Sequence, residues 1–106
     1  MIDLSQVRFD SSGLIPAIVQ DANTLQVLML GYMNSESLTF TKETKKVHFW
    51  SRSRSELWLK GATSGNFLTV QTLSFDCDQD AILVMATPTG PTCHTGSNSC
   101  FEAHND

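Results

Sequence analysis

Short apolar segments separated by polar turns run through most of the chain. The segments at 14–20 and 25–31 are rich in Ile, Val and Leu, and the polar stretch at 21–24 separates them. This alternation predicts a β-hairpin. Pro16 has no backbone N–H to donate, so we expect the first strand either to lie at a sheet edge or to start late.

A short helix is predicted after the hairpin. Asn34 can cap its N-terminus, and Lys45 and Lys46 come in its last turn, where positive charge complements the helix dipole. We therefore expect the helix to run to about Lys46. Its apolar stripe is thin and consists of Leu38 and Phe40.

The second half of the chain is predicted to be mostly strand. Two strands, at 47–51 and 56–60, flank a polar turn, and a loop bounded by Gly61 and Gly65 leads to a long strand at 67–75. The apolar run at 81–87 is expected to be a strand buried on both faces. From Pro88 onward, Pro, Gly, Thr and Ser predict irregular backbone.

Length and composition limit the class of protein. The chain has 106 residues, of which 41% are hydrophobic and 17% charged, so we expect one globular domain over 1–106. Its longest apolar run, 81–86, is far shorter than the roughly 20 residues of a membrane helix. A secretory signal is not evident either. The prediction is a small, mainly β single domain with one or two short helices, located in the cytoplasm and without a membrane partner.

The charge of the chain is unevenly distributed. The net charge is −4, yet six of the seven basic residues fall within 42–60, which leaves that window net positive and the remainder strongly negative. This pattern favours a local anion site over a nucleic-acid surface, which needs broader positive charge. A solvated helix end followed by a polar hairpin is the alternative interpretation.

Three cysteines, Cys77, Cys93 and Cys100, are the first candidates for chemistry. Because their number is odd and no secretory signal precedes them, metal binding or a reactive thiol is favoured over disulfides. Three thiolates suit zinc, although no C-x-x-C pair is present. An open fourth position would make the site catalytic and a fourth protein ligand would make it structural. The alternative is three inert, buried cysteines.

Asp76, Asp78 and Asp80 alternate around Cys77. In extended backbone the three carboxylates would project to one face and the thiol to the other, so we expect two separate sites. Converging carboxylates suit a hard cation such as Mg²⁺ or Ca²⁺. The alternative is a solvated acidic turn.

Two arginines, Arg52 and Arg54, are spaced so that an extended segment would point both guanidinium groups the same way, which suits phosphate or carboxylate oxygens. Lys60, Ser64 and the neighbouring glycine loop could add phosphate donors. Ordinary surface arginines are the alternative.

His94 follows Cys93 directly, so its ring should lie near whatever Cys93 binds. Because adjacent side chains usually diverge, a general acid or base, or a group that supports a ligand, is a more natural role for it than ligation. His48 and His104 are expected to be structural or surface residues.

Five segments carry a resemblance to a known family. They are Leu-Met-Leu-Gly-Tyr-Met-Asn at 28–34, Phe-Trp-Ser-Arg-Ser-Arg at 49–54, Leu-Trp-Leu-Lys-Gly-Ala-Thr-Ser-Gly-Asn at 57–66, Asp-Cys-Asp-Gln-Asp-Ala at 76–81 and Gly-Pro-Thr-Cys-His-Thr-Gly-Ser-Asn-Ser-Cys-Phe at 90–101. In this order the segments resemble the phosphoribosyl-AMP cyclohydrolases of histidine biosynthesis.

The resemblance implies an intertwined homodimer with active sites at the subunit interface. One zinc per subunit would be held by Cys93 and Cys100 of one chain and Cys77 of the other. One magnesium per subunit would be held by three aspartates, namely Asp76, Asp78 and Asp80.

The implied reaction is hydrolytic opening of the adenine ring of N1-(5-phosphoribosyl)-AMP at the N1–C6 bond. Zinc-bound water would attack C6, with His94 as the candidate general base. The substrate phosphates would be held by a set of polar residues, namely Arg52, Arg54, Lys60, Ser64 and Asn66.

Two other interpretations were compared with this one. A cytidine-type deaminase needs His-x-Glu followed by Pro-Cys-x-x-Cys, and neither occurs. A structural zinc module for a protein or RNA partner would use Trp50, Trp58 and the two arginines as a recognition face, with a closed fourth zinc position that His104 could fill. The acidic balance of the chain and the missing C-x-x-C knuckles count against that module.

Overall fold

The computed structural model describes residues 3–102. Within that range the elements, in chain order, are η1 (Leu4–Gln6), β1 (Ile15–Asp21), β2 (Val27–Met33), α1 (Ser35–Thr44), β3 (His48–Ser51), β4 (Glu56–Leu59), β5 (Leu68–Phe75) and β6 (Ile82–Pro88). The mainly β class with one or two short helices is confirmed. In the described part of the chain, no helix is long and apolar enough to cross a bilayer.

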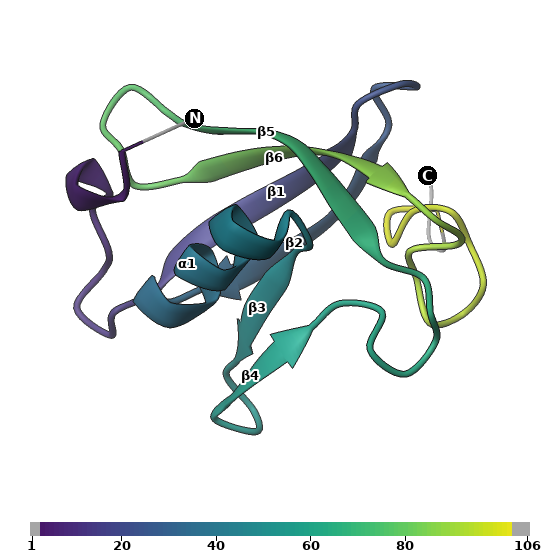
Figure 1. Cartoon of the computed structure of the whole chain (residues 1–106), viewed down its shortest axis with the longest axis horizontal. Helices are drawn as coiled ribbons and strands as arrows, with labels where there is room; N and C mark the ends of the chain where they lie inside the picture. The colour runs from purple at the N-terminus through teal and green to yellow at the C-terminus, as the bar shows by residue number, and fades with distance from the viewer. Residues whose placement is uncertain (1–2, 103–106) are drawn as a thin grey trace.

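A four-stranded sheet in the order β2-β1-β6-β5 is the frame of the domain, and β3 and β4 form a separate two-stranded sheet (Figure 1). Strand β1 runs antiparallel to β2 and parallel to β6. The predicted hairpin is confirmed, although its turn comes slightly later than expected. The Asp21 carboxylate accepts backbone hydrogen bonds from Asn23 and Thr24, and Leu25 adopts a φ of +68°.

Of the two alternatives expected for Pro16, the sheet edge is wrong, because β1 lies between β2 and β6, and a late start is found only in the pairing with β6. Pro16 is the second residue of β1, and pairing with β6 begins only at Ala17, which lies opposite Ile82. The missing N–H of the proline therefore precedes the parallel ladder, and the central strand tolerates it.

Helix α1 begins as predicted. The Asn34 side chain accepts a hydrogen bond from the Ser37 backbone, and the Ser37 hydroxyl accepts one from the Asn34 backbone, which completes a capping box. The helix ends at Thr44, earlier than expected, because Lys45 takes a left-handed conformation (φ +63°) and donates its N–H to the Thr41 carbonyl.

The buried face of α1 differs from the predicted stripe. Leu38 is fully buried as expected, but Phe40 is 37% exposed and stacks on the ring of His48. Thr41 is buried in its place, and its hydroxyl accepts a hydrogen bond from the His48 backbone. A polar residue can line this face because its hydrogen bonds are satisfied.

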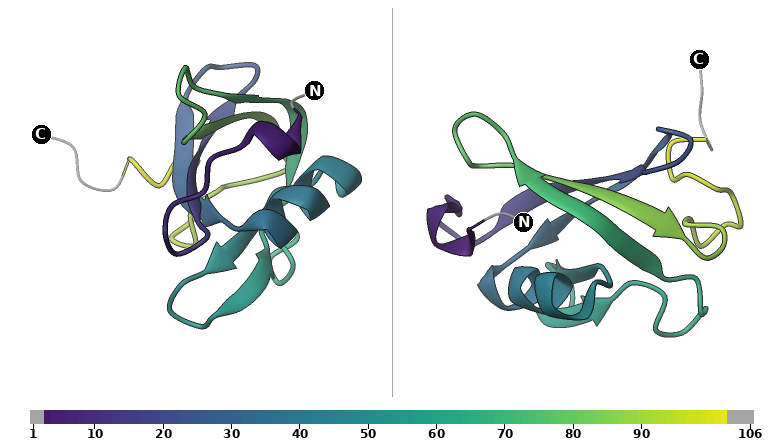
Figure 2. Two further views of the ribbon diagram at one scale, coloured as in Figure 1. Left: turned by 90° about the vertical axis from the view of Figure 1, so that its left-hand side faces the viewer. Right: turned by 45° about the horizontal axis from the view of Figure 1, so that its top comes forward.

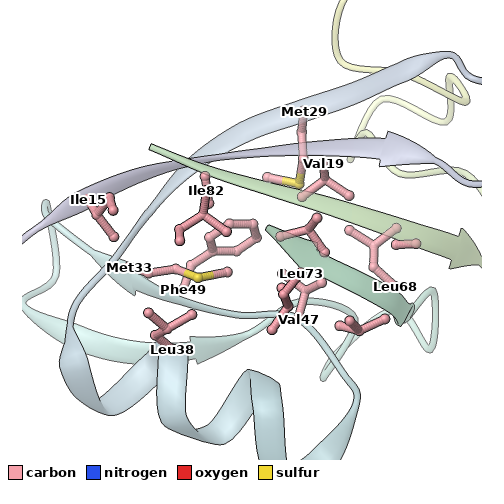
Figure 3. Close-up of a cluster of buried hydrophobic side chains, with 14 of the residues drawn as sticks. Ile15, Val19, Met29, Met33, Leu38, Val47, Phe49, Leu68, Leu73 and Ile82 are labelled. Atoms are coloured by element: carbon pink, nitrogen blue, oxygen red, sulfur yellow. The ribbon is translucent and has the colours of Figure 1, made fainter. Parts of the chain in front are cut away.

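Helix α1 and the β3–β4 hairpin lie on the same side of the four-stranded sheet (Figure 2). The hydrophobic core fills the space between them (Figure 3). Gly31 in β2 makes this packing possible, because a Cβ there would lie 2.6 Å from two ring carbons of Phe49, which is almost fully buried. Only glycine lets β3 approach β2 this closely.

The opposite face of the sheet is apolar and exposed in the described chain. In β6, Ile82, Val84 and Ala86 are buried, whereas Leu83 is only partly buried. The prediction that this strand is buried on both faces is therefore wrong for a single chain. Leu83 lies opposite Ile18, which in turn lies opposite Leu30, and the last two are 36% and 46% exposed. We call Leu83, Ile18 and Leu30 the outer row.

Residues 89–101, here called the cysteine loop, contain no strand or helix, as predicted. The loop is nevertheless tied to β2. The Cys100 N–H donates to the Leu28 carbonyl at 2.8 Å, and the Ser99 hydroxyl donates to the Val27 carbonyl at 2.6 Å. These bonds fix the end of the loop that carries the last cysteine.

Candidate active site

A pocket of about 380 Å³ opens where the end of β4, the glycine loop (residues 61–66) and the cysteine loop meet. Its lining includes several residues that the sequence marked for function, namely Lys60, Ser64, Asn66, Cys93 and His94, together with Trp58. Two segments that are separate in sequence, residues 58–66 and 91–96, thus supply one concave site.

Two glycines allow close packing of the loops around the pocket. Gly61 has a φ of +95°, and a Cβ there would lie 2.7 Å from the backbone of Asn66. A Cβ on Gly90 would collide with the Asn66 side chain. The Thr89 hydroxyl also donates to the Gly65 carbonyl at 3.1 Å. Gly61 thus lets the glycine loop close on itself, and Gly90 lets the cysteine loop pack against the Asn66 side chain.

Each of the two thiols of the cysteine loop contributes to the pKa shift of the other. The Thr95 hydroxyl donates to Cys93 Sγ at 3.1 Å, and this bond is the main cause that lowers the pKa of Cys93 to about 7. The pKa of Cys100 is raised, mainly by burial. The neighbouring Cys93 raises this pKa further. One thiol of the pair is thus poised to ionise near neutral pH.

Cys77 is far from this pair. It lies in the turn between β5 and β6, whereas Cys93 follows the other end of β6 (Figure 1). The seven residues of β6 alone span roughly 23 Å at about 3.3 Å per residue. Within residues 3–102, the only cluster of three potential ligand side chains contains no cysteine. One chain therefore does not bring its three thiols together.

The cluster that does form consists of Asp76, Asp78 and Asp80, whose carboxylate oxygens lie within 4.8 Å of one another on the surface. The predicted convergence is confirmed, but the predicted extended backbone is not. The segment is a tight turn in which Gln79 has a φ of +67° and the Asp80 N–H donates to the Asp76 carboxylate. The turn, and not strand alternation, gathers the carboxylates.

The carboxylates of this cluster influence one another. The hydrogen bond with Asp78 is the main cause that raises the pKa of Asp80. At Asp76, desolvation is the largest single effect and raises the pKa, but hydrogen bonds led by the one from Asp80 outweigh it, and the net pKa is lowered. Oxygen ligands in this arrangement suit a hard divalent cation.

The N-terminal segment also reaches the acidic turn, which the sequence did not indicate. The Arg8 N–H donates to the Gln79 carbonyl at 2.8 Å, and a pocket of about 480 Å³ is lined by Arg8, Asp10, Asp78 and Asp80, among others. No local pattern marks Arg8 or Asp10, because only the fold brings them to this turn.

The two arginines do not act as a parallel pair. Residues 52–55 form a turn, so the extended geometry expected for them is wrong. The Arg52 guanidinium lies 3.9 Å from the centre of the Tyr32 ring, whereas that of Arg54 lies 3.4 Å from the Glu56 carboxylate. Arg52 and Tyr32 line a second pocket, of about 230 Å³, which shares Trp58 with the first.

Lys60 is buried, which is unusual for a predicted phosphate ligand. Its ammonium donates to the Thr92 carbonyl at 2.5 Å and lies 5.7 Å from the Trp58 ring. The sequence did not indicate this contact, or the role of Thr95 beside Cys93. A hydroxyl two residues after a thiol is a local pattern that could have pointed to Thr95.

The other histidines have simpler surroundings. His48 is buried and its ring bonds to the Lys46 carbonyl, which confirms its structural role. His94 is exposed at the mouth of the pocket beside Cys93. His104 lies outside the described residues.

Comparison with known proteins gives one consistent family. The family model for phosphoribosyl-AMP cyclohydrolase matches residues 29–102. The phosphoribosyl-AMP cyclohydrolase of Chloroherpeton thalassium is 61% identical over 90% of this chain and 68% of its own length. That of Lacticaseibacillus casei is 58% identical over 89% of this chain and 86% of its own length.

Longer relatives match equally well. The histidine biosynthesis bifunctional protein HisIE of Oceanobacillus iheyensis is 59% identical over 94% of this chain, but the match covers 46% of the relative. The chain thus spans about half the length of the bifunctional relatives it matches. The matched region includes every segment that builds the pocket between the glycine loop and the cysteine loop. The chain therefore belongs to the phosphoribosyl-AMP cyclohydrolase family.

Proposed function

We propose that this chain hydrolyses the N1–C6 bond of the adenine ring of N1-(5-phosphoribosyl)-AMP in histidine biosynthesis. The observation that carries the proposal is the pocket in which Cys93 and His94 lie beside the glycine loop, in a member of this family. A nucleotide-sized ligand needs a cavity of a few hundred Å³ with a few polar groups, and this pocket meets both conditions.

The donor set fits zinc. Cys93 and Cys100 offer two adjacent soft sulfur ligands, and the lowered pKa of Cys93 favours the thiolate that zinc requires. Bound there, zinc would supply the Lewis acidity that activates a water molecule for attack on C6. The third ligand of the proposed site is Cys77 of a second copy.

A homodimer is part of this proposal. The outer row of Leu83, Ile18 and Leu30 leaves one face of the sheet apolar and exposed, which a second copy of the chain would bury. Cys77 precedes the start of β6, and Cys93 follows its end. Because the length of the strand separates the two thiols, a zinc site of three thiolates requires two chains. The apolar face and the separated thiols thus support the same assembly.

A second metal, magnesium, is proposed for the carboxylate cluster of Asp76, Asp78 and Asp80. These side chains lie at the same turn as Cys77. In a dimer that shares zinc, the cluster of one chain would therefore come close to the pocket of the other. We propose that it neutralises the charge of a bound substrate phosphate there.

The chain's other residues would bind and orient the substrate. His94, exposed at the mouth of the pocket, is placed to accept a proton from the attacking water. Arg52, held over the Tyr32 ring, offers a guanidinium fork for phosphate. The remaining proposed phosphate ligands are Arg54, Lys60, Ser64 and Asn66.

A structural zinc module for a protein or RNA partner is the alternative. It predicts a closed fourth position at the zinc and no turnover. Family membership favours the hydrolase, and the acidic balance of the chain disfavours a nucleic-acid partner. The described cysteines are all free, which suits the reducing cytoplasm that we propose as its location.

The test is conversion of phosphoribosyl-AMP by the purified chain, followed by ultraviolet absorbance after zinc is stripped and again after it is restored. The proposal expects turnover that disappears with zinc and returns with it. Tight zinc binding without turnover would contradict the proposal and favour the structural module.

A further inference from the structure

Lys60 is the residue whose surroundings differ most from its predicted role. The lysine is only 9% exposed, at the end of β4. Within residues 3–102, the one ion pair joins Arg54 to Glu56, so no carboxylate of the described chain balances the Lys60 charge. A buried charge without a counter-charge is costly, and such a group is expected to have a partner that neutralises it.

The observed partners of Lys60 are neutral. Its ammonium donates to the backbone carbonyl of Thr92, which is almost fully buried, and it lies near the Trp58 ring. The Thr92 hydroxyl is the one buried side-chain polar atom of the described residues that has no hydrogen-bond partner. Thr92 is therefore held through its backbone, whose N–H donates to the Asn98 carbonyl and whose carbonyl accepts from Lys60, and not through its side chain.

The neighbouring groups that can carry negative charge are the thiols. Cys93 directly follows Thr92, whose carbonyl accepts the hydrogen bond from Lys60, and Lys60 and Cys93 line the same pocket. A zinc ion with three thiolates carries one net negative charge. A fixed ammonium beside such a centre both balances that charge and holds the loop that supplies two of its ligands.

We propose that Lys60 is a positioning residue of the zinc site. Its ammonium fixes the cysteine loop through the Thr92 carbonyl and balances the charge of the thiolates. The inference rests on the proposed zinc site, and it replaces the binding of substrate phosphate as the main role of Lys60.

Two experiments separate these roles. Zinc affinity is measured on the full chain by competition with a chromogenic chelator, and KM for phosphoribosyl-AMP is measured on the zinc-loaded protein. The variants are K60M, which removes donor and charge, K60Q, which keeps a donor without charge, and K60R, which keeps both. The visible spectrum of the cobalt-substituted protein reports the thiolate geometry in each case.

Two variants are matched controls. K46M also removes one lysine charge, but the Lys46 ammonium lies over the Phe67 ring at 4.2 Å, outside the pocket. T92V removes the unpartnered hydroxyl and keeps the carbonyl that accepts from Lys60. Both controls should bind zinc as the wild type does.

The inference expects K60M to weaken zinc binding by about 10- to 100-fold, the usual effect of removing a group that orients metal ligands. K60Q should lose less, K60R should recover most of the affinity, and the cobalt spectrum should change in K60M. If K60M does not fold, the comparison of K60Q with K60R decides the matter.

Unchanged zinc affinity with a raised KM in the folded variants would overturn the inference and return Lys60 to phosphate binding. An equal loss in K46M would also overturn it, because the effect would then be one of net charge. If the wild type binds zinc but does not convert phosphoribosyl-AMP, the proposed function fails while the zinc affinities still decide the role of Lys60.

Discussion

The Arg52 guanidinium stacks on the ring of Tyr32, with its central carbon 3.9 Å from the ring centre. This contact joins the turn between β3 and β4 to strand β2. The turn belongs to the two-stranded sheet, and β2 belongs to the four-stranded sheet. An exposed arginine side chain is costly to order, and the aromatic ring reduces that cost by fixing the side chain before a ligand arrives.

Replacing Arg52 by Gln should therefore raise the KM for phosphoribosyl-AMP by about 10- to 100-fold, because a hydrogen bond to a charged group contributes about 1.5–3 kcal/mol. Y32L should raise KM less, and Y32F, which keeps the ring, should have little effect. Steady-state kinetics measures the KM of each variant, and the zinc content is determined on the same preparations. An R52Q enzyme with an unchanged KM would remove Arg52 from substrate binding.

His94→Ala should lower kcat by about 10²- to 10⁴-fold, the usual contribution of a general base, without loss of zinc. Added imidazole should restore part of the rate, because the small base can enter the open mouth of the pocket where His94 is exposed. Metal analysis and kinetics on the same preparation provide the measurement. Unchanged turnover with unchanged zinc would show that His94 is not the base.

Asp78→Asn should have opposite effects with and without a divalent cation. In EDTA the variant should unfold at a higher temperature than the wild type, because Asp78 is a main cause of the raised pKa of Asp80 and repels its ionised form. Added Mg²⁺ should stabilise the wild type more than the variant.

The pH dependence of the same pair has a definite sign. A carboxyl group whose pKa is raised by folding destabilises the folded state once it is ionised. The ionisation of Asp80 therefore lowers the stability of the metal-free wild type as the pH rises from 3.8, the ordinary pKa of an aspartate, through the raised pKa of Asp80. D78N should lose less stability over that interval. Equal thermal unfolding curves for both proteins in EDTA would contradict this account of the cluster.

Ile18→Lys should dissociate the proposed dimer and reduce its zinc content together. Full burial of an isoleucine side chain contributes about 1.5–3 kcal/mol, and Ile18 has 36% of its surface left to bury, so the loss of this burial from both copies should weaken association by about tenfold. L25K is the matched control, because Leu25 is 61% exposed at the hairpin turn and outside the outer row. Sedimentation with zinc analysis tests this, and a zinc-loaded I18K monomer would contradict the shared site.

Local patterns in the sequence predicted much of the fold. The Asn34 cap, the polar turn at 52–55 and the strand β5 each depend on a few neighbouring residues, and all three are found, although a bulge between Val70 and Thr72 interrupts the alternation of β5. The place of β1 inside the sheet could not be predicted in this way, because it depends on the distant strand β6. Of the sheet edge and the late start that Pro16 indicated, only a late start of the pairing with β6 is found.

In the candidate site, too, groupings of residues close in sequence could be predicted, and contacts between distant residues could not. The carboxylates of the acidic turn and the neighbours Cys93 and His94 are close in sequence, so their grouping could be predicted. The contact of Lys60 with Thr92 joins residues 32 positions apart and depends on how two loops pack. The burial of β6 on both faces could not be judged from its apolar sequence, because Leu83 is only partly buried in the described chain.

Mixed dimers of C77A and C93A subunits test the central claim most directly, because each homodimer lacks a complete set of three thiolates. Subunits that carry different tags are exchanged, and the dimers with both tags are purified before zinc and turnover are measured. The shared-site account predicts about one zinc per mixed dimer and about half the wild-type turnover, since Cys93 and Cys100 of one chain meet Cys77 of the other. Mixed dimers without zinc and without turnover would contradict it.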